Sequence, residues 1–155
     1  MKTLGCLIAV VALALLMPPA GWSQNKIYTN ISNETLEKIL QGLELKFQKV
    51  ERKEKEASLT IYDFKRGDQP YRLNNYGSDL WIECQFDDKL KLEGVNRWNA
   101  EAKFSRAVLI DQKEKTIVSL ESQMDCLGGV TDAMVKQFIN RFDEETKRFV
   151  KSMPK

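Results

Sequence analysis

The chain contains no histidine among its 155 residues. Histidine titrates near pH 7 and is the usual general base and a common metal ligand, so its absence excludes a Ser-His-Asp triad. An excess of charge of one sign is also missing, since 24 Lys and Arg residues balance 22 Asp and Glu residues to a formal net charge of +2. This balance predicts no strong attraction to nucleic acid or to an anionic membrane.

Cysteine is scarce, and the chain has only Cys6, Cys84 and Cys126. No two of them have the CXXC spacing, which argues against a dithiol redox catalyst. Cys84 and Cys126 both fall on the apolar side of predicted strands. That placement is equally compatible with one disulfide between them and with two buried free thiols.

An apolar run long enough to span a bilayer is missing too. The run from Leu4 to Met17 has about 14 residues, whereas a spanning helix needs roughly 20. With Lys2 before it and prolines and small residues after it, the run has the three parts of a secretory signal over residues 1–23. We expect cleavage after Ser23, because cleavage after Ala20 would leave a proline at −3. The mature protein is then periplasmic or secreted, with no stable membrane anchor.

The rest of the chain has the length of one domain. We expect a leader over residues 24–31 and a single domain over residues 32–152. Helical spacing of apolar residues predicts a helix over residues 33–41, capped by Ser32 and ended by Gly42. A second helix is predicted to open at Asp87 and Asp88, acting as caps rather than as a catalytic pair, and to carry Leu92, Val95 and Trp98 on one face. Thr131 is predicted to cap a strongly amphipathic last helix.

Alternating apolar residues predict the strands. They are expected over residues 43–47, 59–64, 71–75 and 80–86, then over 104–110 and 117–124, with a charged turn over 51–56. The order is therefore helix, three or four strands, helix, two strands, helix. Short hairpin connections favour a mostly antiparallel sheet flanked by helices, a two-layer α+β domain.

Motifs for ligand chemistry are absent. No calcium-loop spacing occurs, and no lysine follows Gly128 and Gly129 at phosphate-loop spacing. We expect no cofactor, no metal and no enzymatic activity, although a Ser-Lys pair is not excluded. An alternative to a binding module is a small-ligand carrier with a pocket between sheet and helices. Its lining would be the aromatic residues Tyr62, Tyr71, Tyr76 and Trp81.

Three short motifs together resemble the YbjN family, described as bacterial sensory transduction regulators. They are the helix end Val95-Asn96-Arg97-Trp98-Asn99, the strand Lys103-Phe104-Ser105-Arg106-Ala107 and the helix start Gly128-Gly129-Val130-Thr131. The resemblance implies a fold like that of type III secretion chaperones and no catalytic residues. The motif residues are read as structural: Asn96, Trp98, Asn99, Phe104, Arg106, Gly128, Gly129 and Thr131.

Within that resemblance each motif residue has an expected role. Trp98 should anchor the core, and Asn99 should end its helix through side-chain bonds to the backbone. Phe104 should pack inward, and Arg106 should pair with a carboxylate. Gly129 should permit the turn into the last helix.

These patterns predict a non-enzymatic exported domain that binds a protein partner and has a regulatory role. The analogy with secretion chaperones concerns shape only, because those proteins act before export and this chain carries an export signal. Whether the domain acts as a monomer or as a homodimer is left open.

Overall fold

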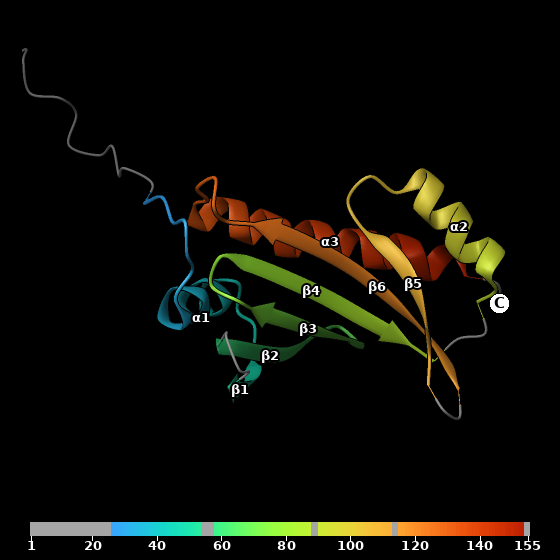
Figure 1. The fold of residues 1–155 in the computed structure, drawn as a ribbon, viewed down its shortest axis with the longest axis horizontal. Helices are drawn as coiled ribbons and strands as arrows, with labels where there is room; N and C mark the ends of the chain where they lie inside the picture. Colours follow the sequence, from blue (N-terminus) through green and yellow to red (C-terminus); the bar gives the residue numbers. More distant parts are fainter. Residues whose placement is uncertain (1–25, 54–57, 88–89, 113–114, 154–155) are drawn as a thin grey trace, which may run out of the picture.

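A computed structural model describes residues 26–53, 58–87, 90–112 and 115–153 (Figure 1). The predicted signal segment over residues 1–23 and Asp88 lie outside these ranges, as do residues 54–56 of the predicted turn over 51–56. The leader packs more closely than expected. Tyr28 exchanges backbone hydrogen bonds of 2.8 and 2.9 Å with Val130, and Ile31 is 1% exposed.

The element order matches the prediction, with the fourth strand of the first group present. In chain order the elements are α1 (Asn33–Gly42), β1 (Phe47–Lys53), β2 (Ser58–Arg66), β3 (Gln69–Asn75), β4 (Asp79–Phe86), α2 (Leu92–Glu101), β5 (Arg106–Asp111), β6 (Thr116–Asp125) and α3 (Asp132–Ser152). The strands form one six-stranded sheet in the order β1-β2-β3-β4-β6-β5. Every neighbouring pair is antiparallel, which confirms the α+β class.

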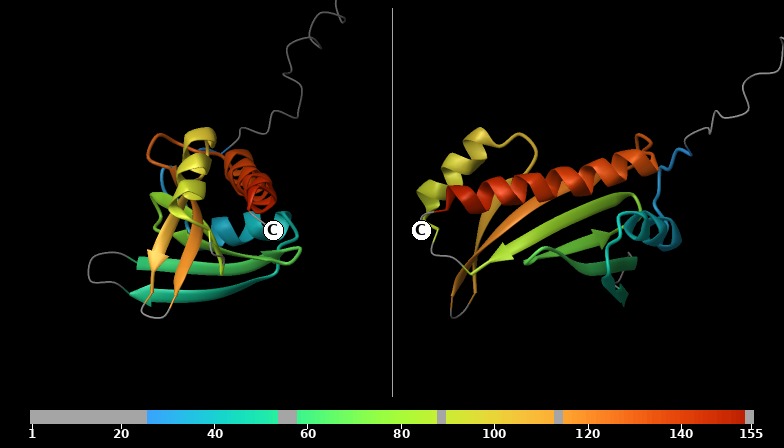
Figure 2. Two further views of the ribbon diagram at one scale, coloured as in Figure 1. Left: turned by 90° about the vertical axis from the view of Figure 1, so that its right-hand side faces the viewer. Right: turned by 180° about the vertical axis from the view of Figure 1, so that it is seen from behind.

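The helices gather on one face of the sheet. α1 and α3 lie against the same side, and α2 packs on β5 next to the end of α3 (Figure 2). The sheet is strongly twisted, so the β5–β6 hairpin crosses the direction of β1 and β2 (Figure 2, left). The opposite face of the sheet carries no helix in the described part of the chain, and we call it the helix-free face.

The core lies between the sheet and the helices α1 and α3. The two helices bury residues such as Leu36, Ile39 and Phe142, and the sheet buries Tyr62 and Leu73 against them. Each fully buried aliphatic or aromatic side chain of this kind contributes roughly 1.5–3 kcal/mol relative to an exposed one. The long amphipathic helix α3 is therefore a main source of stability.

Two helix caps agree with the sequence, and one does not. Ser32 Oγ accepts from the Thr35 N–H at 3.3 Å, and Thr131 Oγ1 accepts from the Met134 N–H at 3.3 Å. Gly42 does not end α1 as predicted, because it is the last helical residue. The left-handed conformation instead falls on Glu44, with φ of 57°.

The start of α2 was wrongly predicted. The helix begins at Leu92, and Lys91 occupies the cap position without a side-chain bond. Asp87 forms an ion pair of 2.6 Å with Lys115 instead. Leu92 is 61% exposed, so only Val95 and Trp98 bury the inner side of the helix. The helix therefore begins five residues after Asp87.

The strand boundaries also shifted at two places. The first strand begins at Phe47, since Leu43 and Leu45 belong to the connection after α1, and it continues through residues 51–53, where a turn was expected. The fifth strand, β5, begins at Arg106 rather than at Phe104 as predicted.

The two cysteines of the domain are free thiols, so the disulfide alternative is wrong. Cys126 follows the residue paired with Asp79, and its N–H donates to the Ser78 carbonyl at 2.8 Å. Cys84 lies five residues further along β4, about 16 Å away at the usual rise per strand residue. A disulfide needs Cα atoms closer than about 7 Å.

Candidate functional site

A row of polar side chains crosses the helix-free face. The strand registers place one residue of every strand in this polar row, which reads Gln48, Asp63, Arg72, Glu83, Glu121 and Arg106 from β1 to β5. Residues directly opposite each other in antiparallel strands have Cβ atoms about 5 Å apart and interact. The row is therefore one continuous electrostatic unit across the sheet.

The charges in the row are only partly compensated. Arg72 binds Asp63 through two hydrogen bonds of 2.8 and 2.9 Å, a bidentate geometry. Arg106 Nε lies 3.4 Å from Glu121 Oε2. Glu83 and Glu121 are cross-strand neighbours of like charge. Burial raises the pKa of the Glu83 carboxyl, Arg72 opposes that rise, and Glu121 adds to it.

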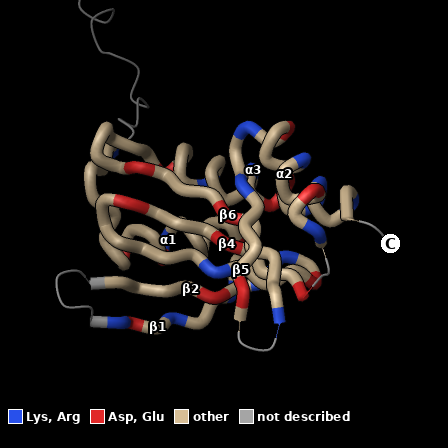
Figure 3. The backbone as a smooth tube through the Cα atoms, turned by 45° about the vertical axis from the view of Figure 1, so that its right-hand side comes forward, with Lys and Arg blue, Asp and Glu red and all other residues tan. Residues whose placement is uncertain are grey.

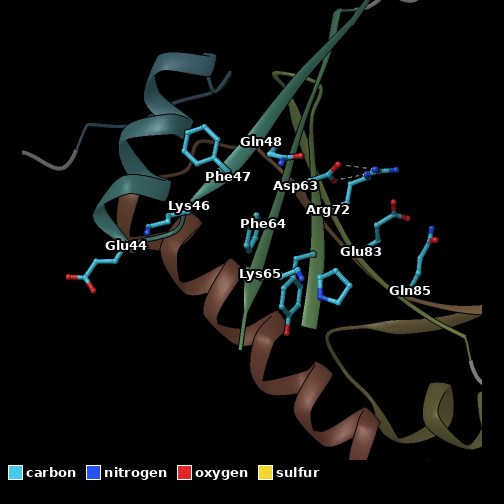
Figure 4. A pocket seen from close by; sticks show the side chains of 12 residues that line it. Glu44, Lys46, Phe47, Gln48, Asp63, Phe64, Lys65, Arg72, Glu83 and Gln85 are labelled. Carbon is cyan, nitrogen blue, oxygen red and sulfur yellow. Dashed lines mark hydrogen bonds and ion pairs between the residues drawn. The ribbon is translucent and has the colours of Figure 1, made fainter. Parts of the chain in front are cut away.

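An open groove of about 830 Å³ lies along the β1 to β4 part of this row. Figure 4 shows Asp63, Arg72, Glu83 and Gln85 pointing to the same side of the sheet, away from α3. Lys65 and Pro70 extend the lining, and Glu44, Lys46 and Phe47 line it near the edge strand. The ionic groups along the groove include both signs, which suits a polar surface of mixed charge.

A smaller hollow of about 320 Å³ continues the surface at the other end of the row. It is lined by Trp81 on β4 and by motif residues such as Asn99, Phe104 and Arg106. The Arg106 guanidinium lies 5.2 Å from the centre of the Trp81 ring, within cation–π range. The segment from α2 into β5 thus contributes side chains to this second hollow.

Several motif residues have the structural roles expected of them. Trp98 is 5% exposed and packs edge-on against Phe149, with ring centres 5.0 Å apart. Phe104 packs against Phe138 at 5.7 Å. Arg106 pairs with Glu121.

For other motif residues, the structure corrects the expected role or adds to it. Asn99 does bind backbone, but at Ala107 of β5 rather than at the end of its own helix. Gly129 has φ of 91° and sits against Ile27, whereas Gly128 has open space around it. Asn96 is exposed on α2.

The four aromatic residues expected to line a carrier pocket are not brought together. Tyr62 and Tyr71 are 0% and 3% exposed on the helix side of the sheet, and their hydroxyls donate to Glu37 and Asp143. Trp81 points to the opposite face, because it is paired with Asn74 and Gln123. The aromatic residues of the sheet therefore serve two different surfaces.

Sequence reasoning missed the polar row. The available signal is a charged residue at an outward position of each inner strand: Asp63, Arg72, Glu83 and Glu121. Such residues are ordinary for a solvated sheet face. Only the register between strands distant in sequence shows that they form one line.

Other site chemistry is not assembled in the parts that the structure describes. No three Cys, Asp or Glu side chains there gather in a way that could hold a metal ion. No helix of the described ranges combines the length and apolarity that crossing a membrane requires. Burial raises the pKa of Cys84 to about 12 and of Cys126 to about 11, so neither thiol is an activated nucleophile.

Comparison with known proteins agrees with this architecture. Residues 32–154 match the YbjN family, described as "Putative bacterial sensory transduction regulator". No curated protein matches the chain. Among solved structures, the chain is similar to "YbjN, a putative transcription regulator from E. coli", with a TM-score of 0.62 and 12% identity. The likeness covers 81% of this chain and 92% of that one, and at this identity it shows the fold alone. Because the family match spans most of the residues, this chain belongs to the YbjN family.

Proposed function

We propose that this chain is a non-enzymatic, exported regulatory protein that acts by binding a protein partner on its helix-free face. The observation that carries the proposal is the groove along the polar row, an open surface lined by side chains from four strands and the connection after α1. The family description names a regulator and no reaction. A regulator without catalysis must act through a surface that recognises another molecule.

The charge of the groove favours protein over nucleic acid as the partner. Lys46, Lys65 and Arg72 are matched by Glu44, Asp63 and Glu83. Nucleic-acid sites need a surplus of cations to replace counterions along the phosphates. A segment of polypeptide with both signs of charge fits this lining better, since complementary patterns of charge select the partner and its orientation.

Export rests on the signal pattern over residues 1–23. The expected mature protein begins at Gln24 and meets its partner in the periplasm or outside the cell. The intact mass of the protein recovered from the periplasm tests this point, and recovery of the full-length chain in the cytoplasm alone would exclude export.

Site-specific photocrosslinking in the periplasm of an expressing bacterium tests the binding face. A photoreactive residue at Gln85, exposed in the groove, should give adducts with a discrete protein. The matched control is Glu144, exposed on α3. Adding Arg72→Glu should abolish the adduct from position 85 without unfolding the protein. Adducts formed equally from position 144, or none from position 85, would contradict the proposed face.

A further inference from the structure

Two glutamates face each other in the middle of the polar row. Glu83 of β4 is paired with Glu121 of β6 on the helix-free face. Figure 3 shows acidic positions side by side on these two neighbouring strands near the middle of the sheet. Carboxylates directly opposite one another repel and cost stability. Proteins break such local rules mainly at functional sites, so the pair is a candidate for binding a cation.

The polar row is one cation short at this pair. It contains three carboxylates and only two guanidinium groups. Arg72 makes its two hydrogen bonds to Asp63. Arg106 lies 3.4 Å from Glu121. No ion pair among the described residues includes Glu83. A cation supplied by a ligand would therefore complete the charge balance of the row.

A buried hydroxyl without a partner lies beside the two glutamates. Ser119 is two residues before Glu121 on β6, so its side chain points to the same face of the sheet. Ser119 is 0% exposed, and its Oγ has no hydrogen-bond partner among the described residues. Nearly all buried polar atoms in proteins are hydrogen-bonded. This hydroxyl is therefore available to a ligand that reaches the glutamates.

The residue opposite Ser119 completes the site. Gln85 of β4 is paired with Ser119 and is exposed. Figure 4 shows Glu83 and Gln85 pointing to the same side of the sheet, away from α3. An exposed amide can rotate to uncover the Ser119 hydroxyl and can offer its own oxygen as an acceptor. We call these four residues the β4–β6 acidic site: Glu83, Gln85, Ser119 and Glu121.

The β4–β6 acidic site lies where the two hollows of the helix-free face meet. Glu83 and Gln85 line the groove, and Glu121 lines the smaller hollow beside Trp81. Burial raises the pKa of the Glu83 carboxyl, and Glu121 adds to that rise. A cation bound between the two carboxylates would oppose both effects. A side chain that enters along the groove can therefore reach the site and stabilise it.

We propose that the β4–β6 acidic site binds an arginine side chain of the partner polypeptide. The inference rests on the proposed function and names the side chain that anchors the partner. A guanidinium has five N–H donors in one plane, enough to reach two carboxylates and a hydroxyl together. A lysine ammonium has three donors and holds water more strongly. A metal ion fits less well, because no three Cys, Asp or Glu side chains of the described residues gather to hold one.

An ordinary solvated sheet face explains these observations less well. Such faces carry charged residues, but water satisfies their polar atoms. Here the Glu121 side chain is 9% exposed and Ser119 is 0% exposed. Polar groups with so little access to water need partners of defined geometry. The site is therefore built to take a specific group.

Titration of the mature chain, followed by nuclear magnetic resonance, tests the site without the partner. The probe is a capped glycine–arginine–glycine peptide, and the matched controls carry lysine or citrulline, a neutral analogue of arginine, in its place. The arginine peptide should shift the backbone amides of Ser119 and Glu121 saturably, with a dissociation constant of about 1–10 mM. The lysine peptide should bind at least about threefold more weakly, and the citrulline peptide should not bind.

Substitutions separate binding from stability. Glu83→Gln and Glu121→Gln should each weaken binding of the arginine peptide at least about tenfold, and Glu83→Gln carries the test if the other variant unfolds. Glu93→Gln, exposed on α2, is the matched control and should bind as wild type does. Ser119→Ala should weaken binding about threefold without lowering the midpoint of urea unfolding, since its hydroxyl has no partner in the described structure. A purely structural hydroxyl would give the reverse result.

The same substitutions connect the site to the partner. Glu83→Gln should reduce the photocrosslinked adduct from position 85 at least about fivefold, whereas Glu93→Gln should leave it unchanged. An undiminished adduct would overturn the anchoring role of the site and leave the binding face in place. If the wild-type chain gives no adduct while the arginine peptide binds, the proposed function fails and the specificity of the site for a guanidinium stands.

Two further results would overturn the proposal. One is equal binding of the arginine, lysine and citrulline peptides, or binding that Glu83→Gln does not weaken. The other is saturable binding of calcium that displaces the arginine peptide, which would assign the β4–β6 acidic site to a metal ion instead.

Discussion

Asp143 on α3 joins three elements through one buried carboxylate. Tyr71 donates to its Oδ1 at 2.8 Å, Lys147 lies 2.7 Å from its Oδ2, and Arg66 approaches to 3.6 Å. Burial alone raises the pKa of the Asp143 carboxyl. The hydrogen bonds from Lys147 and Tyr71 outweigh burial and hold that pKa below its ordinary value. The charge is therefore stabilising in the folded protein.

Replacing this carboxylate should destabilise the fold. Asp143→Ala leaves the Tyr71 hydroxyl buried without its acceptor, so we expect a loss of about 2 kcal/mol in urea unfolding at pH 7. A lowered folded pKa contributes stability above the unfolded pKa, and that contribution is lost as pH falls through the folded pKa. The difference from wild type should therefore shrink in acid. Glu144 follows Asp143 in the chain and is exposed, so Glu144→Ala should change the free energy of unfolding little at any pH.

Glu83 shows the opposite behaviour at the residue scale. Its pKa is raised, so the charged form costs stability as pH rises through the raised value. Glu83→Gln removes the cost of burying this charge and also the repulsion from Glu121, while Arg72 keeps its bond to Asp63. We expect a gain of about 0.5–1 kcal/mol in the free energy of unfolding at pH 7.

The gain should vanish below the ordinary pKa of a glutamate, where wild type is also neutral at this position. Urea unfolding at pH 7 and near pH 3.5 measures both values. Glu93→Gln, exposed on α2, is the control. A loss of stability at pH 7 would mean that attraction to Arg72 outweighs the cost of burial and the repulsion from Glu121 together.

At the scale of elements, the amide side chain of Asn99 connects α2 to β5 through two hydrogen bonds. Asn99 donates to the Ala107 carbonyl at 3.0 Å and accepts from the Ala107 N–H at 2.7 Å. The amide thus makes the two backbone hydrogen bonds that a neighbouring strand would make to one residue of β5. Asn96 and Asn99 are both exposed on α2, and Asn99 is the one that makes these hydrogen bonds.

Substituting Asn99 and Asn96 separately should show that they contribute differently to stability. Asn99→Ala should lower the free energy of unfolding by about 1–2 kcal/mol, because it breaks two partly buried hydrogen bonds. Hydrogen exchange at the Ala107 amide should accelerate more than at other β5 amides. Asn96→Ala should leave both measurements near wild type. Equal effects of the two substitutions would contradict the assigned role of Asn99.

At the scale of the whole molecule, the reactivity of the two buried thiols measures whether the core unfolds as one cooperative unit. Cys84 lies within β4 and Cys126 just beyond β6, both at 1% exposure or less. Because both thiols are buried, we expect no reaction with an aromatic disulfide reagent in the folded state. Both should react together at the urea transition. Intact mass without reduction should show both free thiols, and a bridged species would contradict the geometry.

Much of the fold follows from local patterns. Ser32 and Thr131 cap their helices through hydrogen bonds that span three residues, and the alternation in β6 places Val118 and Leu120 inward. Asp87 and Asp88 show where local reasoning failed. They carry a cap signature, but the helix begins only at Leu92 and Asp87 meets Lys115, a residue 28 positions away.

The sequence by itself determined the element order, the family motifs, the inward faces of the strands and the lack of histidine chemistry, because these depend on short-range periodicity and residue type. Only the tertiary structure decided that β6 lies between β4 and β5, that Cys84 and Cys126 are far apart, and that one polar residue from each of the six strands lies in one row. Strand register is set by packing and pairing between residues distant in the chain, and no local pattern encodes it.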